Sequence, residues 1–172
     1  MYGVNVTDST GPDEPRWLDK DEAAAWRGLL AVVQRAFPEI ERDLRAHHDM
    51  LAVHYHILVT LSEAPERTMR LAELADTANL SQSRLTHRLR TLIERGEVEI
   101  CQDPRDGRAK HATLTKAGQQ RLDTAAPDHV ETVRRLIFDH LSPSQTVALA
   151  KALAPVAQSL CAHPEYLNPK PC

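Results

Sequence analysis

The chain has 172 residues, of which 42% are hydrophobic and only 4% aromatic, and its net charge is −3. This length suits one domain with an extension, and a core drawn mainly from Leu, Ala and Val favours helices over sheets. The overall charge excludes a globally basic nucleic-acid binder. Residues 81–121, however, hold nine Lys/Arg against five Asp/Glu, a net +4, while the segments before and after are acidic. A local basic segment on an acidic chain predicts one phosphate-binding surface.

The cysteines and the N-terminal sequence indicate the compartment. Cys101, Cys161 and Cys172 lie far apart and form no C-x-x-C motif, so we expect neither a structural zinc site nor a disulfide framework. The first residues lack the basic start and apolar run of a signal peptide. No apolar stretch approaches the roughly 20 residues of a membrane span. We therefore expect a cytoplasmic protein with no cofactor and no membrane contact.

The N-terminal part predicts a tail followed by a long helix. Residues 1–18 are polar and contain Gly and Pro, as is typical of a flexible tail. Asp19 followed by Glu22 is a capping pattern that starts a helix near Lys20. Apolar residues at helical spacing extend this helix within the segment 19–50.

A helix-turn-helix is the next predicted arrangement. The apolar run 51–61 is interpreted as a helix, and residues 71–78 as a short helix ended by a left-handed Asn79. Ser81 is a good N-cap for a second helix at 82–95. A short helix, a tight turn and a capped second helix is the geometry of DNA-binding helix-turn-helix motifs.

The 82–95 helix has two different faces. Its apolar stripe consists of Leu85, Leu89, Leu92 and Ile93. The opposite face, at helical spacing, carries the polar residues Arg84, His87, Arg88, Thr91 and Arg95. Gly96 ends the helix.

Two alternating segments around Val98–Ile100 and Ala112–Leu114 predict an antiparallel hairpin, because apolar and polar residues alternate in both. The D-P-R-D-G-R sequence between them is typical of a turn, because Asp, Pro and Gly favour turn conformations. A lobe over residues 51–115 therefore combines a helix-turn-helix with a two-stranded wing.

The C-terminal part predicts two more helices. Thr115 caps the first, which is expected to run from Lys116 through Leu141, and Ser142 begins a capping box for the second. The helical region spans residues 116–162, and residues 163–172 form a tail. Amphipathic stretches at both ends of the chain need a partner surface. They predict a homodimer whose two-fold axis sets two copies of the 82–95 helix on a palindromic double-stranded DNA site.

Six short motifs occur in a consistent order along the chain: LAVHYHIL at 51–58, LAELA at 71–75, LSQS at 80–83, LIERGEV at 92–98, DPRDGRA at 103–109 and LTKAG at 114–118. With these motifs the chain resembles the MarR family of bacterial winged-helix transcription regulators over roughly residues 20–160. The DPRDGRA sequence matches that family's wing pattern most closely.

The resemblance implies a mainly α fold, a winged helix-turn-helix whose terminal helices form the dimerisation region. It also implies a recognition helix in the major groove, a wing at the minor groove, and control by a small-molecule effector bound between the dimer helices and the DNA-binding lobe. Two positions depart from the family pattern. Glu97 stands where an apolar residue is usual, and the first wing strand reads Glu99-Ile100-Cys101 where Arg is common. Both are expected to soften phosphate attraction beside the wing.

Base readout is expected from the first turns of the recognition helix. Gln82 can pair bidentately with adenine, and Ser and Thr hydroxyls can meet base edges. Arg84 and Arg88 fit either guanine or phosphate, whereas Arg90 and Arg95 fit phosphate better. The full predicted set on this helix is Ser81, Gln82, Ser83, Arg84, Thr86, His87, Arg88, Arg90 and Arg95.

The wing tip is expected to contact the minor groove. A narrow minor groove concentrates negative potential and attracts a guanidinium, which favours Arg105. Asp103 is placed to pair with it and orient it, as the family pattern implies. The predicted wing residues are Asp103, Arg105, Asp106, Arg108 and Lys110.

The predicted effector-pocket residues are Trp26, Arg27, His48, His54 and Tyr55. For Trp26, packing at the dimer seam is the competing interpretation. The histidine cluster raises metal sensing as an alternative, but His54 and His56 are two apart and point to different helix faces, so no metal site is predicted. Redox sensing at Cys101, and a winged helix that binds protein in place of DNA, are further alternatives. No nucleophile, metalloprotease or phosphate-loop motif occurs, so no enzyme is predicted.

Overall fold

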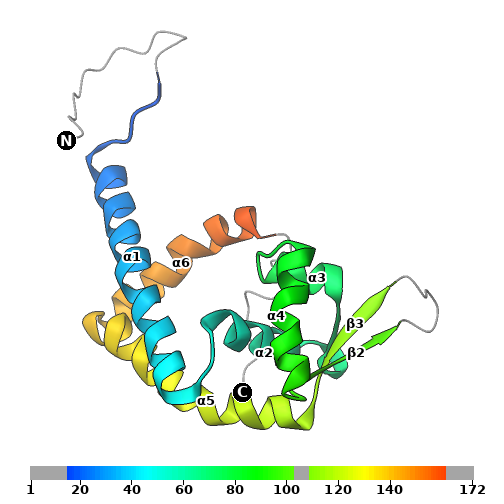
Figure 1. Ribbon diagram of the computed structural model, residues 1–172. Helices are drawn as coiled ribbons and strands as arrows, with labels where there is room; N and C mark the ends of the chain where they lie inside the picture. Colours follow the sequence, from blue (N-terminus) through cyan, green and yellow to red (C-terminus); the bar gives the residue numbers. More distant parts are fainter. Residues whose placement is uncertain (1–14, 103–108, 162–172) are drawn as a thin grey trace. The chain divides into compact units, whose positions relative to one another are not determined.

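The structure is a computed structural model that describes residues 15–102 and 109–161 (Figure 1). Within them the elements are α1 (Lys20–His48), α2 (Ala52–Glu63), η1 (Pro65–Arg67), β1 (Thr68–Arg70), α3 (Leu71–Thr77), α4 (Gln82–Glu94), β2 (Val98–Gln102), β3 (Lys110–Leu114), α5 (Lys116–Leu136), η2 (Phe138–His140) and α6 (Pro143–Leu160). The mainly helical fold with a small antiparallel sheet confirms the predicted winged-helix class. The chain forms two compact units, one up to Glu39 and one from Ile40 onward.

The start of α1 follows the predicted cap. The Asp19 carboxylate accepts hydrogen bonds from the backbone N–H groups of Asp21 and Glu22, both at 2.8 Å. The Glu22 carboxylate in turn accepts from the backbone N–H of Asp19 at 3.0 Å. These bonds satisfy donors that the first turn of a helix leaves unpaired. The helix continues through Pro38 to His48.

The sheet has one strand more than the sequence predicts. The predicted hairpin forms, with Val98 opposite Leu114 and Gln102 opposite Lys110. The short β1 pairs with the other side of β3, which gives the order β1-β3-β2. A three-residue strand is too short to show the alternation by which strands are recognised in a sequence.

The core lies where α2, α3, α4 and the sheet meet (Figure 1). Its largest fully buried side chains are Ile57, Leu58, Leu61, Leu74, Leu85, Leu89, Leu92 and Val98. Burying each of these aliphatic side chains contributes about 1.5–3 kcal/mol. Of the predicted α4 stripe, Ile93 is the exception, since 43% of it remains exposed.

The C-terminal helices differ in length from the prediction. Helix α5 ends at Leu136 and is followed by the short η2, whereas the sequence predicted continuation through Leu141. Ser142 then forms the predicted capping box with Gln145 at the start of α6. No residue of α6 is buried. In the described part of the chain, no helix is both long and apolar enough to cross a membrane.

Gly118 lies where α5 closely approaches the wing, at Glu97 and Leu114. A Cβ at this position would come within 2.1 Å of the Glu97 backbone oxygen and 2.6 Å of Leu114 Cδ1. The hydroxyl of Thr115, the N-cap of α5, donates to the Gly96 carbonyl at 2.7 Å and accepts from the Gly118 N–H at 3.0 Å. Thr115 and Gly118 together fix where α5 leaves the wing.

We expect Gly118→Ala to lower the free energy of unfolding by about 1–3 kcal/mol, because the added methyl group meets a backbone oxygen that has little room to move. Gly28→Ala is the matched control, since a Cβ there meets nothing within 4 Å. The control should be neutral, or stabilising by up to about 1 kcal/mol as a helical Gly-to-Ala change. Urea unfolding of both variants measures the difference, and equal stabilities would contradict the close approach.

Candidate nucleic-acid interface

Helix α4 is held as a rigid element by its cap and its buried face. The Ser81 hydroxyl accepts the backbone N–H of Arg84 at 3.4 Å, which confirms the predicted N-cap. Leu85, Leu89 and Leu92 are 1–2% exposed and pack in the core. The preceding turn uses Asn79 at φ 51°, the predicted left-handed residue. The opposite face of α4 is thereby fixed toward solvent.

The solvent face of α4 carries most of the predicted DNA-binding residues. The side chains of Gln82, Arg84, His87 and Arg90 are exposed and have no hydrogen-bonding or ionic partner within the described ranges. Arg88 is half-buried beside them. A helix that presents an amide, an imidazole and guanidinium groups without partners has the donors needed for base edges and phosphates.

The predicted hydroxyl groups are already engaged locally. The Thr86 hydroxyl donates to the Gln82 carbonyl at 2.8 Å, one turn back along α4. The Ser81 and Ser83 hydroxyls lie 3.2 Å apart and share a hydrogen bond. Hydroxyls have two acceptor lone pairs, so these groups retain the capacity to accept a bond from a base.

The end of α4 is a left-handed turn that leads into the wing. Gly96, at φ 69°, donates its N–H to the Ile93 carbonyl at 2.9 Å, and the Glu97 N–H bonds the Leu92 carbonyl at 2.8 Å. This pair of bonds is the Schellman motif, which confirms Gly96 as the predicted stop. The turn directs the chain straight into β2.

Glu97, which was expected to soften phosphate attraction beside the wing, faces inward. It is only 6% exposed, and its carboxylate lies 3.6 Å from Nε of Arg121 on α5. Burial raises the pKa of Glu97, and the guanidinium groups of Arg121 and Arg95 partly oppose that rise. The carboxylate of Glu97 therefore interacts with Arg121 of α5 inside the protein.

Three helices meet at what we call the Asp49 junction, formed by His48, Asp49, Arg95, Glu97 and Arg121. Arg95, one residue past the end of α4, donates to the Asp49 carboxylate at 2.7 Å and to its carbonyl at 3.1 Å. Arg121 of α5 donates to the carbonyl of His48, the last residue of α1. Arg95 was predicted to contact phosphate, and in this structure its guanidinium is bound to Asp49.

The wing is described only at its base. Lys110, at the start of β3, is exposed and belongs to the described residues. The other predicted wing residues, Asp103, Arg105, Asp106 and Arg108, lie outside the described residues. Their predicted roles therefore stay predictions from the sequence. Cys101, on β2, is a free and exposed thiol.

The predicted effector residues occupy different environments. Trp26 and Arg27 are exposed on the part of α1 that belongs to the first unit, and His48, His54 and Tyr55 belong to the second. His54 is buried, and its Nε2 has no hydrogen-bond partner in the described part of the chain. Burial and then the charges of Arg88 and Arg95 lower the pKa of His54.

Tyr55 packs against His129 of α5, with ring centroids 4.2 Å apart and ring planes tilted by 39°. Burial raises the pKa of Tyr55 and lowers that of His129. This contact joins α2 to α5 next to a cavity of about 370 Å³, between the end of α1 and the second half of α5. Of the five predicted effector residues, only His48 lines that cavity.

The polar residues that shape the cavity were not predicted from the sequence. Asp43 accepts hydrogen bonds from Thr132 at 3.1 Å and from Arg135 at 3.0 Å, and His48 bonds Asp128 at 2.9 Å. Each pair joins α1 to α5 across 80 to 92 residues of sequence, so no local pattern reveals it. The one available signal was the spacing of Asp128 and Thr132, which places both on one face of a helix. In the described part of the chain, no cluster of His, Cys, Asp or Glu is arranged to hold a metal ion.

Comparisons with known proteins agree with this geometry. A family model described as the MarR family matches residues 48–109. A MarR family transcriptional regulator from Streptomyces coelicolor, solved in complex with DNA, is 37% identical with a TM-score of 0.78, and the match covers 86% of this chain and 92% of that chain. AbsC, another MarR family transcriptional regulator from Streptomyces coelicolor, is 36% identical with a TM-score of 0.77, over 85% of this chain and 98% of that chain.

A more distant structure shares the fold alone. BpsR of Bordetella bronchiseptica, whose DNA binding is regulated by 6-hydroxynicotinic acid, is 19% identical with a TM-score of 0.67, over 78% of this chain and 98% of that chain. A comparison with curated proteins found no match.

We expect the free energy of unfolding to fall as the pH is lowered from 7.5 to 5.5. The folded-state pKa values of His54 and His129 lie below the ordinary value of about 6.5. The unfolded chain therefore binds protons that the folded chain does not, and stability present above about pH 6.5 is lost as the pH falls toward the folded-state values.

His54→Leu removes one of these two histidines and should reduce the stability that is lost at low pH. The reduction is at most about 1.4 kcal/mol for each unit by which the fold lowers the pKa of His54. Urea unfolding at both pH values, at one chain concentration, measures it. His140→Asn, at an exposed position in η2, is the control. The same pH dependence in His54→Leu and the native chain would contradict the buried, neutral state of His54.

Proposed function

The chain belongs to the MarR family of transcriptional regulators, and we propose that it binds a palindromic DNA operator as a homodimer whose affinity a small molecule modulates. The observation that carries the DNA-binding proposal is the solvent face of α4, where Gln82, Arg84, His87 and Arg90 project without partners within the described ranges. Helix α4 enters the major groove, and the wing reaches the adjacent minor groove.

In this proposal the contacts divide into two kinds. Gln82 and His87 read base edges, and Arg90 binds phosphate. Arg84 lies in the first turn of α4, where either a guanine or a phosphate is within reach. Arg105, predicted from the sequence alone, inserts into the minor groove and is oriented by Asp103.

Exposed apolar side chains on the terminal helices support the homodimer. Helix α6 has no buried residue, although Val147, Leu153, Val156 and Leu160 are 40–79% exposed. On α1, Trp26, Leu29, Val33 and Phe37 are 44–59% exposed. A helix of this composition gains its stability from packing, so these surfaces are suited to a second copy of the chain. A two-fold dimer then presents two copies of α4, as a palindromic site requires.

The proposed control acts on the separation of the two recognition helices. Two half-sites lie one DNA turn, about 34 Å, apart. An effector that favours a dimer with a different separation lowers operator affinity by shifting the population away from the matching form. The cavity between α1 and α5 supports this part of the proposal, because it adjoins the Asp49 junction that holds the end of α4.

We expect Arg84→Ala to weaken operator binding without loss of fold. Fluorescence anisotropy with palindromic sites from the DNA flanking its own coding region, over a range of salt concentrations, measures the effect. A phosphate contact predicts a uniform loss across sequences and a salt slope reduced by about one. A guanine contact predicts a loss of about 1–3 kcal/mol that is confined to sites with that base.

Arg134→Ala is the matched control for charge, because Arg134 is exposed on the last turn of α5 and pairs only weakly with Asp139 at 3.7 Å. Its operator affinity should equal that of the native chain. Native affinity in Arg84→Ala, or no salt-dependent binding of the native chain to any such site, would reject the proposed interface.

We expect Leu153→Glu to dissociate the dimer, because a carboxylate buried in an apolar interface has no partner there. Sedimentation equilibrium at micromolar concentrations measures the mass. Gln158→Glu adds the same charge at another exposed position of α6 and serves as a comparison. A monomeric native chain, or a fully dimeric Leu153→Glu, would exclude α6 from the dimer interface.

A further inference from the structure

The cavity between the last turns of α1 and the second half of α5 has one apolar wall and one strongly polar side. Its volume is about 370 Å³. Ile40 and Leu44, both buried residues of α1, form the apolar wall. This size and this wall suit a small ring or short alkyl chain.

The charged groups of the lining are mostly acidic. Three carboxylates line the cavity, those of Asp43, Asp128 and Glu131, against one guanidinium, that of Arg135. Asp128 and Glu131 are three residues apart on α5, so both lie on the same face of that helix. Glu131 has no partner among the described residues.

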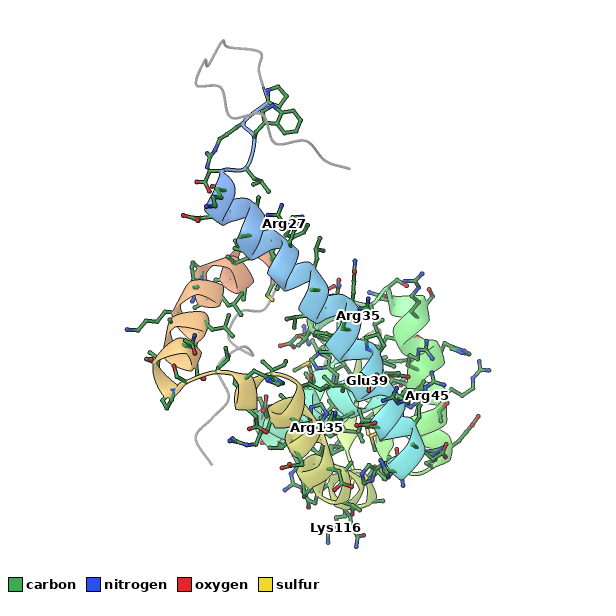
Figure 2. All side chains as sticks on the ribbon, turned by 90° about the vertical axis from the view of Figure 1, so that its left-hand side faces the viewer. Arg27, Arg35, Glu39, Arg45, Lys116 and Arg135 are labelled. Atoms are coloured by element: carbon green, nitrogen blue, oxygen red, sulfur yellow. The ribbon has the colours of Figure 1, made fainter. Side chains whose placement is uncertain are left out.

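The guanidinium in the cavity lining, that of Arg135, is already bound to a carboxylate. Arg135 projects from α5 (Figure 2), and its Nη2 donates to the Asp43 carboxylate at 3.0 Å. The Thr132 hydroxyl donates to the same carboxylate at 3.1 Å, and Arg42 approaches it at 3.9 Å from outside the cavity. An anionic ligand that bound Arg135 would break the ion pair between Arg135 and Asp43. The partly buried Asp43 carboxylate would then lose one of its hydrogen-bond donors, which is unfavourable.

The three histidines in the lining do not make the cavity favourable for an anion. His48 is bonded to Asp128 at 2.9 Å, so a proton on its ring would be matched by that carboxylate. Burial lowers the pKa of His129, which disfavours its charged form. His47 lines the cavity from an exposed position, where water screens its charge.

We propose that this cavity binds a small organic cation, an amine or amidinium with a compact apolar body, seated between the α1 wall and the carboxylates of Asp128 and Glu131. The apolar body packs on Ile40 and Leu44, and the cationic group donates to the two α5 carboxylates. This inference rests on the proposed function only for its effect on DNA; the binding itself does not depend on it.

Binding at Asp128 has a route to the recognition helix. A cation at Asp128 competes with His48 for the same carboxylate group, of which His48 contacts Oδ2. The carbonyl of His48 accepts from Arg121, and the next residue, Asp49, holds Arg95 at the end of α4. Release of His48 therefore loosens the turn that positions the end of α4.

Three benzene derivatives of nearly equal shape test the ligand class: benzamidine, a cation; benzamide, which is neutral; and benzoate, an anion. Isothermal titration of the full-length chain with each probe should give the affinity order cation, neutral, anion. We expect benzamidine to bind at least about tenfold more tightly than benzoate. Benzoate binding as tightly as benzamidine, or no binding of benzamidine at millimolar concentration by a folded chain, overturns the proposal.

The site is tested by the double variant Asp128→Asn with Glu131→Gln, at two exposed positions where the amides keep hydrogen-bonding capacity. This variant should lose at least about tenfold in benzamidine affinity and keep its benzamide affinity. Asp123→Asn, on the same helix but outside the cavity lining, is the matched control and should bind benzamidine as the native chain does. Unchanged benzamidine affinity in the double variant places the cation elsewhere and refutes the site.

Operator binding, measured in parallel, tests the proposed DNA-binding function separately from the proposed ligand class. Benzamidine should weaken operator binding by the native chain and have no effect on the double variant. A chain that binds benzamidine as expected but binds no DNA refutes the proposed function and leaves the ligand class standing. A chain that binds its operator but prefers benzoate refutes the ligand class alone.

Discussion

The orientation of helix α4 depends on the turn at Asp49. Its left-handed φ of 43° ends α1, and the carbonyls at that end lack helical partners. Arg121 and Arg95 supply charged donors to them, one from α5 and one from the end of α4. Cations at a helix C-terminus are favoured by the helix dipole as well. One turn therefore sets three helices against each other, and a change at either end of the turn reaches α4.

The burial of Glu97 belongs to the same constraint. A buried position carries a carboxylate here, and Arg121 lies beside it at 3.6 Å. Removing charges from water is costly, and the geometry must be good for the pair to compensate. The arrangement stabilises one specific approach of α5 to the wing, which the close contact at Gly118 also requires. Electrostatics and packing thus select the same orientation.

Local signals were enough to predict most of the secondary structure from the sequence. Asp19, Asn79, Ser81, Gly96 and Ser142 act on neighbours within a few residues, so their pattern determines the helix ends. The features that the sequence did not predict depend on residues far apart in the chain or have only a weak local sequence preference. Strand β1 exists through pairing with β3, and the cavity exists through contacts between α1 and α5. The exposed face of α4 was predictable because helical periodicity alone separates it from the buried stripe.

Helix α6 has a consequence for gene dosage. Because none of its residues is buried within the single chain, in the proposed dimer its folding and the assembly of two chains become one event. The amount of competent regulator then rises roughly with the square of chain concentration while the protein is scarce. While most chains are monomeric, a cell with half the transcripts would hold about a quarter of the active regulator. Control of the target genes would then switch on over a narrow range of expression.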